Sequence, residues 1–134
     1  MRVTASAAAI AAVLALAGGS AALADDMMHP VLGAHLAGMG EHGVVNIHSY
    51  ATQGKLCWTF GLHTKGVTGA TIRDAHGMVV AHLGMHYAVK GCDAAPKKAL
   101  DLIEAKPASY WVWVATKSHP GELRGKLFAG MAHM

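Results

Sequence analysis

The amino-acid sequence predicts an all-β fold, an antiparallel β-sandwich of about seven strands with one short helix. After residue 30 the chain is a succession of short apolar segments that are rich in β-branched and aromatic residues. Glycine- or proline-containing turns separate these segments at close intervals, which is typical of an antiparallel sandwich or barrel rather than of a parallel α/β sheet. A single segment, close to residue 100, is rich in helix-forming residues instead.

The candidate strands are short stretches that are bounded by turn residues and dominated by apolar or alternating residues. The clearest alternation places Leu56, Trp58, Phe60 and Leu62 on one face of the third strand. In chain order the candidate strands are Val31–Leu36, Val44–Tyr50, Lys55–His63, Val67–Arg73, Met78–His86, Tyr110–Ala115 and Glu122–Phe128.

The last hairpin, Tyr110–Leu127, has the clearest turn chemistry. Pro120 presets φ at the second position of a type II turn, and Gly121 takes the positive φ that the third position needs. The strand that follows alternates between two faces, one with Leu123, Gly125 and Leu127, the other with Glu122, Arg124 and Lys126. We expect Glu122 and Arg124 to pair with each other or to reach neighbouring strands, in a structural role.

The first strand of this hairpin is apolar on both sides. Trp111 and Trp113 share a face with Ala115, while the opposite face carries Tyr110, Val112 and Val114. Such a strand either lies at the centre of a sandwich or exposes an aromatic patch. We favour core packing, with Gly125 giving an indole room to lie across the backbone. The alternative is that Trp111 and Trp113 form a binding patch for a ligand or partner.

One segment, Pro96–Ala105, is predicted to be a short helix. It is rich in helix formers, begins with a proline and is followed by Pro107. Asp93 is the expected N-cap, and Leu100 and Ile103 are expected to pack inward. The final residues, 129–134, are expected to be a frayed tail.

The N-terminus has the pattern of a secretory signal peptide. Arg2 gives a positive start, an apolar run from Val3 to Ala17 follows, and Ala22–Ala24 places small residues at the positions that a signal peptidase recognises. We expect cleavage after Ala24, so that residues 1–24 are a signal peptide and residues 25–134 form one exported domain, periplasmic or secreted. No later segment approaches the roughly 20 apolar residues of a transmembrane helix.

The distribution of basic residues indicates whether the protein binds nucleic acid. Lysine and arginine number 11 against 8 acidic residues, but they are scattered, whereas a nucleic-acid-binding protein would have a clustered basic stripe. We therefore expect no nucleic-acid partner.

The chain has two cysteines, Cys57 and Cys92. An even pair in an exported protein predicts a disulfide. The alternative is that the two cysteines are thiolate ligands of a metal.

Several segments together resemble the CHRD domain, a module named after chordin that also occurs alone in exported bacterial proteins. The resemblance covers nearly all of the chain after the signal peptide. It is closest at the end, where Pro120–Leu127 is similar to the family's "P-x-G-E-[IL]-R-G-x-L" pattern through Pro120, Gly121, Glu122, Arg124 and Gly125. The other matching segments are Ala34–Gly38, Gly54–Trp58, Gly66–Ala70, Gly91–Cys92 and Pro107–Tyr110. The resemblance implies an exported scaffold domain.

The chain departs from the family pattern at specific positions. Where the family usually has two histidines around an isoleucine, this chain has Thr71 and Arg73, and Ala115 replaces a further histidine near the last turn. Trp113 stands where the family usually has asparagine. If the family's histidine cluster binds a metal or ligand, the equivalent site in this chain is missing or rebuilt.

Ten histidines and eight methionines are the main compositional oddity. Imidazole suits Cu(II) and Zn(II), and thioether suits Cu(I), so a metal site using copper or zinc is one interpretation. The candidate ligands are Met28 and His29 near the new N-terminus, together with His76, His82 and His86. The other interpretation is that the histidines are solvated surface residues and the methionines fill the core.

These observations favour a non-enzymatic binding or structural module with a protein or small-molecule partner. The first alternative is an exported copper-handling protein that uses surface histidine and methionine. The second is an enzyme similar to the small copper/zinc dismutases, which would need a close cluster of at least three histidines. No serine lies in a Gly-x-Ser-x-Gly elbow, so the sequence offers no nucleophile for a hydrolase.

Overall fold

The computed structural model describes residues 29–38, 40–117 and 123–134. The expected signal peptide, the candidate ligand Met28 and the turn residues Pro120, Gly121 and Glu122 lie outside these ranges. Among the described residues, no helix is long and apolar enough to cross a membrane.

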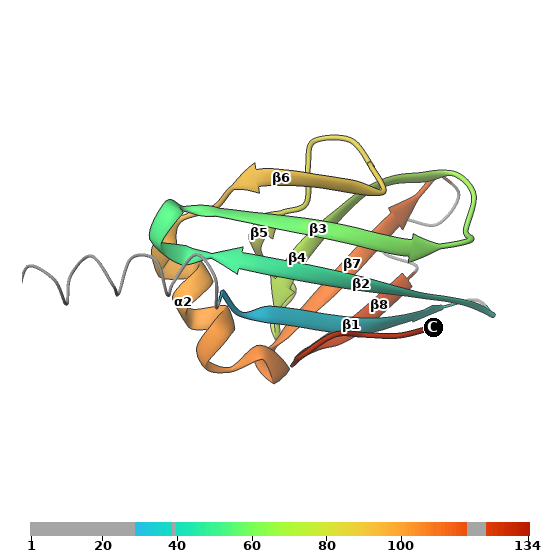
Figure 1. Cartoon of the computed structure of the whole chain (residues 1–134). Helices are drawn as coiled ribbons and strands as arrows, with labels where there is room; N and C mark the ends of the chain where they lie inside the picture. The colour runs from blue at the N-terminus through green and yellow to red at the C-terminus, as the bar shows by residue number, and fades with distance from the viewer. Residues whose placement is uncertain (1–28, 39, 118–122) are drawn as a thin grey trace, which may run out of the picture.

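Most of the described chain forms one antiparallel sheet of eight strands (Figure 1). The strand order across the sheet is β5-β4-β7-β8-β1-β2-β3-β6, so the first strand of the described chain lies near the middle beside the last one. The strands are β1 (Val31–Gly38), β2 (Glu41–Tyr50), β3 (Lys55–Leu62), β4 (Val67–Asp74), β5 (Val79–His82), β6 (Lys90–Ala94), β7 (Tyr110–Thr116) and β8 (Leu123–Ala129). The predicted all-β fold with one short helix is confirmed.

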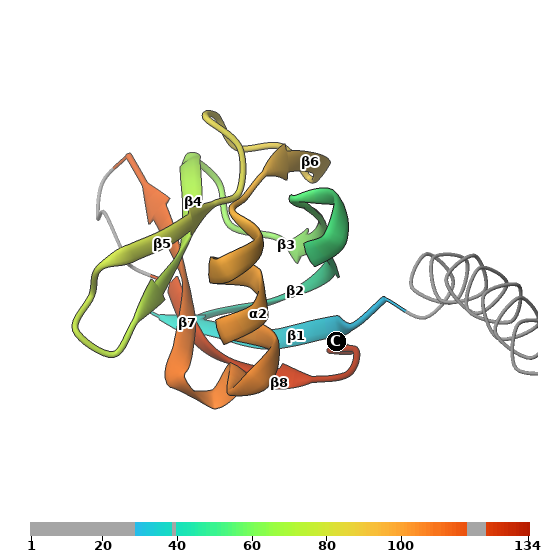
Figure 2. The same ribbon diagram turned by 90° about the vertical axis from the view of Figure 1, so that its left-hand side faces the viewer.

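The sheet curls round one core into a nearly closed barrel (Figure 2). Its two edge strands, β5 and β6, are not paired with each other. The segment that connects them bonds to both sides of the opening. Leu83 donates its backbone N–H to a carbonyl of β4 at 3.1 Å, and the carbonyl of Val89 accepts from the N–H of Phe60 in β3 at 2.7 Å. These bonds satisfy backbone groups that an open sheet edge would leave without partners.

One end of the barrel is covered by α2 (Lys97–Ala105), which lies in front of the strands in Figure 2. Leu100 and Ile103 point into the core, as predicted, and each is about 1% exposed. The expected N-cap is wrong: Asp93 lies in β6 and accepts a hydrogen bond from the N–H of Ala94. Pro96 occupies the N-cap position and makes no side-chain cap. Two short 3-10 turns, η1 (Ala51–Gln53) and η2 (Pro107–Ser109), complete the secondary structure.

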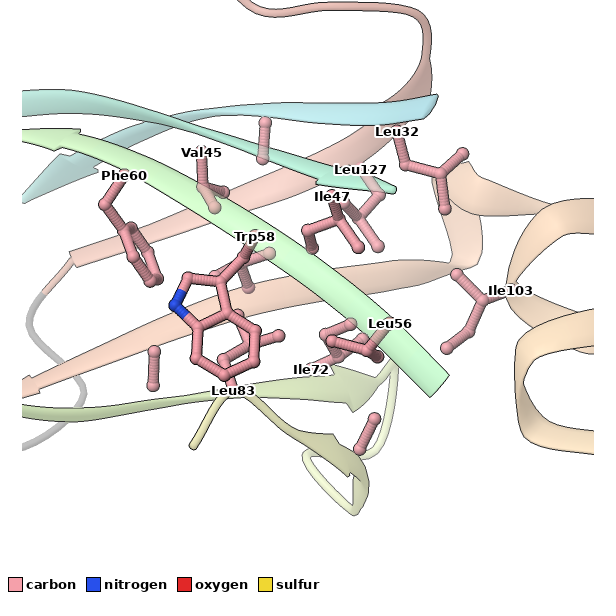
Figure 3. Close-up of a cluster of buried hydrophobic side chains, with 14 of the residues drawn as sticks. Leu32, Val45, Ile47, Leu56, Trp58, Phe60, Ile72, Leu83, Ile103 and Leu127 are labelled. Carbon is pink, nitrogen blue, oxygen red and sulfur yellow. The ribbon is translucent and has the colours of Figure 1, made fainter. Parts of the chain in front are cut away.

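The core is formed by the inward faces of the strands and of α2 (Figure 3). Leu56, Trp58 and Phe60 all point inward from β3, which confirms the predicted alternation. Trp58 fills the region beneath β6, because a Cβ on Gly91 would lie 2.8 Å from its ring. Its indole N–H donates to the carbonyl of Ala88 at 3.0 Å, so the one polar atom of this buried ring has a partner.

The predicted disulfide joins Cys57 of β3 to Cys92 of β6. The two residues face each other directly in the register of these strands. Their side chains lie on the outer face of the sheet, since the neighbours Leu56 and Trp58 point inward. The bond therefore fastens an edge strand to the rest of the sheet.

Two strand predictions need correction. The expected strand Met78–His86 is shorter, because β5 covers only Val79–His82 and the chain then turns. In addition, β6 (Lys90–Ala94) was not predicted, because it has no run of apolar residues. This strand is held by backbone pairing with β3 and by the disulfide, and neither leaves a hydrophobic pattern in the sequence.

The expectation of a frayed C-terminal tail is wrong. The carboxamide of Asn46 in β2 accepts from the N–H of Ala132 at 2.6 Å and donates to its carbonyl at 3.1 Å. Ala132 is 3% exposed. It lies directly on Gly33 of β1, where a Cβ would come within 2.7 Å of the Ala132 nitrogen. The tail is therefore bound across the outer face of β1 and β2.

The hairpin of β7 and β8 pairs Val112 with Gly125 and Trp113 with Arg124. The predicted faces of β8 are confirmed, with Leu123 and Leu127 buried and Arg124 and Lys126 exposed. Gly125 has a different role from the one expected. A Cβ there would overlap the carbonyl oxygen of His35 and lie 2.8 Å from the carbonyl carbon. Glycine thus allows β1 and β8 to approach closely, and it does not make room for an indole.

Candidate functional site

Trp111 and Trp113 lie on the outer face of the barrel, so the favoured expectation of core packing is wrong. Along β7 the buried residues are Val112, Val114 and Thr116, and the two tryptophans alternate with them. Both indoles are half-buried. Because side chains alternate along a strand, the two valines hold β7 on the core and fix the indoles outside. The alternative aromatic patch is the arrangement that forms.

Three cationic side chains pack on these two rings. The guanidinium carbon of Arg73 in β4 lies 4.6 Å from the centre of the Trp113 ring, and that of Arg124 in β8 lies 4.8 Å from it. The ammonium of Lys126 lies 5.4 Å from the centre of the Trp111 ring. All three separations are within the range of cation–π attraction. We call these five residues the tryptophan–arginine surface.

The register of the sheet explains this grouping. β7 lies between β4 and β8, so Trp113 has Thr71 opposite it on one side and Arg124 on the other. Arg73 lies opposite Trp111, one pair further along, and reaches back to Trp113. Each indole is therefore within reach of side chains from both neighbouring strands.

Arg73 is held in place by two hydrogen bonds. Its Nε donates to the hydroxyl of Thr71 at 3.0 Å, and its Nη1 donates to the carbonyl of Gly77 at 3.3 Å. The turn that contains Gly77 is itself fixed by Asp74, whose Oδ1 accepts the backbone N–H of His76 and of Met78. An arginine has five N–H donors, so two such bonds leave donors on the guanidinium for a ligand.

Two surface cavities border Trp113. The first, of about 340 Å³, is bordered by residues of β4, β5 and β7 that include Thr71, Arg73, His82, Trp113 and Ala115. The second, of about 450 Å³, is bordered by residues of β1, β4, β7 and β8 that include Ala37, Asp74, Trp111, Trp113 and Arg124. Asp74 is the one carboxylate among the described residues that border either cavity. The surface thus combines aromatic rings, positive charge and recesses.

The three positions at which the CHRD pattern usually has histidine lie together. Thr71, Arg73 and Ala115 all border the 340 Å³ cavity, with Trp113 between them. These residues come from β4 and β7, which pair in the sheet. The sequence identifies these positions, but only the pairing of β4 with β7 places them at one cavity.

The metal-ligand candidates are dispersed. His82 is exposed at the end of β5, His76 is exposed in the turn before it, and His86 is exposed in the turn after it. Across the described ranges, no three His, Cys, Asp or Glu side chains come together in a group that could hold a metal ion. The cluster that a dismutase-like site requires is therefore not formed by these residues.

His29 does meet a second histidine. Its Nε2 lies 2.7 Å from Nδ1 of His48 in β2, so one ring donates an N–H to the other. Burial, and next the charge of His29, lower the pKa of His48 below its usual value, because each disfavours the imidazolium. The ring of Tyr50 packs against His29 with centroids 4.3 Å apart. His48 was not among the predicted site residues, because only the pairing of β1 with β2 brings it close to His29.

One buried serine, Ser49, has a hydroxyl that is already hydrogen-bonded to another side chain. The hydroxyl of Ser49 is buried and donates to Oε2 of Glu104, which ties β2 to α2. Its role in the structure is a contact between these two elements. Glu122 lies outside the described residues, so the expected Glu122–Arg124 pair falls outside them too.

No protein-family model and no curated protein sequence matches this chain. The resemblance to the CHRD domain stays a prediction from the sequence motifs.

Proposed function

We propose that this protein is an exported, non-enzymatic binding module of the CHRD type, and that the tryptophan–arginine surface binds an acidic ligand. The observation that supports this proposal most directly is the position of Trp113 between two arginines that reach its ring from neighbouring strands. Export is supported by the signal-peptide pattern of residues 1–24 and by the Cys57–Cys92 disulfide, which is typical of oxidising compartments.

The chemistry of the surface favours a negatively charged ligand. A guanidinium binds carboxylate and phosphate groups through paired, charge-assisted hydrogen bonds. Stacking on an indole keeps the guanidinium in one orientation before the ligand arrives, which lowers the conformational entropy lost on binding. Arg73, Arg124 and Lys126 supply three positive charges, and Oδ1 of the nearby Asp74 is engaged by backbone N–H groups.

The two cavities favour a ligand that is large enough to occupy both of them. Trp113 borders both of them, so a ligand that enters both would contact its indole. Large aromatic side chains and arginine are the residue types that contribute most to binding at interfaces. A ligand with acidic groups and a flat or apolar portion would use both features of the surface.

The proposal is tested by titration of the mature protein with three polymers of different charge chemistry. Poly-glutamate presents carboxylates, polyphosphate presents phosphates, and neutral dextran presents neither. We expect at least one polyanion to bind saturably at low salt, and we expect dextran not to bind. Intrinsic tryptophan fluorescence measures the binding. Arg124→Gln should weaken the binding about tenfold or more, because it removes a charged hydrogen-bond donor.

The chain contains a matched control for a cation that packs on an aromatic ring. The ammonium of Lys55 lies 5.2 Å from the centre of the Tyr50 ring, away from the tryptophan–arginine surface. Lys55→Gln should leave polyanion affinity close to that of the wild type, whereas Lys126→Gln should lower it. Equal losses in both variants would mean that net charge alone governs the binding. That result, or the absence of any polyanion binding, would overturn the proposal.

A further inference from the structure

We propose that Sγ of Cys92 in the Cys57–Cys92 disulfide is a thiol-exchange site, at which a low-molecular-weight thiol forms a mixed disulfide. Cys92 is exposed on the edge strand β6, whereas Cys57 is half-buried on β3. Exposed disulfides are the ones that exchange most readily with external thiols. This site shares no residue with the tryptophan–arginine surface and is independent of the proposed ligand-binding function.

The register of the sheet makes the two sulfurs unequal. Cys57 has a paired residue on both sides, His48 of β2 on one and Cys92 of β6 on the other. All three side chains lie on the outer face, so both flanks of Cys57 are occupied. Because β6 is an edge strand, Cys92 has a paired strand on one side only. An incoming thiolate therefore reaches Sγ of Cys92 more readily than Sγ of Cys57.

A surface cavity of about 380 Å³ beside the disulfide gives room for the small thiol. Both cysteines border this cavity, and so does Lys90. Lys90 precedes Cys92 by two residues, so the two side chains lie on the same face of β6. The attacking species in exchange is the thiolate, which a nearby ammonium attracts. No carboxylate is among the described residues that border the cavity, so the local charge favours an anionic thiol.

The exchange balances without any further reactant. The thiolate attacks Sγ of Cys92 and forms a new sulfur–sulfur bond there, while the Cys57 sulfur leaves with the electron pair of the broken bond. The Cys57 thiolate then takes a proton from water. One disulfide is broken and one is formed, so no net oxidation occurs. The Cys57 thiolate can also attack the mixed disulfide and expel the small thiol, which makes the modification reversible.

The exchange should loosen this edge of the barrel. Without the covalent bond, β6 is held to β3 by backbone pairing. Gly91 of β6 lies against the ring of Trp58, and the indole N–H donates to the carbonyl of Ala88 just before β6. Both contacts depend on the position of β6. We therefore expect the amide hydrogens of Lys90–Ala94 to exchange with solvent faster in the thiol-modified protein than in the oxidised protein.

The test treats the native, oxidised protein with reduced glutathione and stops the reaction with iodoacetamide, which alkylates the released thiol. Peptide mass spectrometry then identifies the cysteine that carries glutathione. We expect glutathione on Cys92 and the alkyl group on Cys57, with a preference of about tenfold or more, because exchange follows access to the sulfur. The same reaction in denatured protein is the matched control. Both sulfurs are then equally accessible, so the preference should disappear.

Two lysine variants test the contribution of the cavity. Lys90→Gln should slow the exchange with glutathione about two- to fivefold at low salt, the size of effect that an exposed charge exerts. Lys98→Gln should leave the rate unchanged, since Lys98 is exposed on α2 and does not border the cavity.

Four results would overturn the proposal. The first two are glutathione mainly on Cys57 and an equal distribution over both cysteines in the native protein. The third is a native disulfide that stays intact at a glutathione concentration that opens it in the denatured protein. The fourth is equal slowing by Lys90→Gln and Lys98→Gln, which would mean that net charge alone governs the rate.

Discussion

The carboxamide of Asn46 holds the backbone of Ala132 by two hydrogen bonds. Oδ1 of Asn46 accepts from the N–H of Ala132, and Nδ2 of Asn46 donates to the carbonyl of Ala132. In a sheet, a neighbouring strand would bond the N–H and the carbonyl of such a residue. Here the side-chain amide bonds both groups in place of that strand. The contact explains why residues near the C-terminus are ordered on the sheet although they form no strand.

Asn46→Ala should lower the free energy of unfolding by about 1–3 kcal/mol, because each hydrogen bond contributes about 0.5–1.5 kcal/mol. Asn46→Asp is the informative companion. Its carboxylate still accepts from the N–H of Ala132 but cannot donate to the carbonyl, so about half of the loss is expected. Urea unfolding measures both values. Wild-type stability in Asn46→Ala would show that the tail contributes nothing.

The disulfide should stabilise the fold through its long loop. The bond closes a loop with a sequence separation of 35. In the chain-entropy model, such a loop stabilises by about 3–4 kcal/mol. Replacing both Cys57 and Cys92 by alanine should therefore lower stability by about this amount. It should also speed amide hydrogen exchange in β6, which the bond fastens to β3. A loss below about 1 kcal/mol with β6 still protected would contradict the role assigned to the bond.

Stability should fall on acidification because of His48. Its pKa in the folded state lies below the value of 6.5 for an unperturbed histidine, so the unfolded chain binds more protons in this range. The contribution is fully present above about pH 6.5 and is lost as the pH falls from there to the folded pKa. We expect the wild type to lose more stability between pH 7.5 and pH 5 than His48→Gln does. Parallel losses in urea unfolding would exclude this effect.

The close approach of β1 and β8 should make Gly125 intolerant of any side chain. A Cβ there would overlap the backbone carbonyl of His35, and a backbone cannot move as a flexible side chain does. We expect Gly125→Ala to cost about 2–3 kcal/mol or more in urea unfolding. Gly69→Ala is the control, since a Cβ at this strand position on the outer face meets no atom within 4 Å. Similar stabilities for the two variants would contradict this assignment.

The hydrophobic pattern predicted most of the fold. Alternation in Leu56, Trp58 and Phe60 identified the buried face of β3, and the apolar residues of α2 identified its inward side. These features depend on local periodicity, which the sequence carries directly. β6 was missed because its position depends on backbone pairing and on a distant cysteine.

The candidate site was predicted only in part. Because β7 is apolar on both faces, its pattern could not decide which side faces the core. In the structure Val112 and Val114 are fully buried, while the indoles make cation–π contacts on the outer face. The sequence marked Arg73 only as a departure from the CHRD pattern and did not mark His48, because the partners of both side chains come from other parts of the chain.

The most direct measurement of the central claim uses the three indole N–H signals in a ¹⁵N-resolved NMR spectrum. The Trp58 indole donates to Ala88 inside the core, whereas Trp111 and Trp113 lie on the outer face. We expect the polyanion that binds to shift the signals of Trp111 and Trp113 and to leave that of Trp58 in place. Binding that leaves the Trp111 and Trp113 signals unmoved would contradict the assignment of the tryptophan–arginine surface as the ligand-binding site.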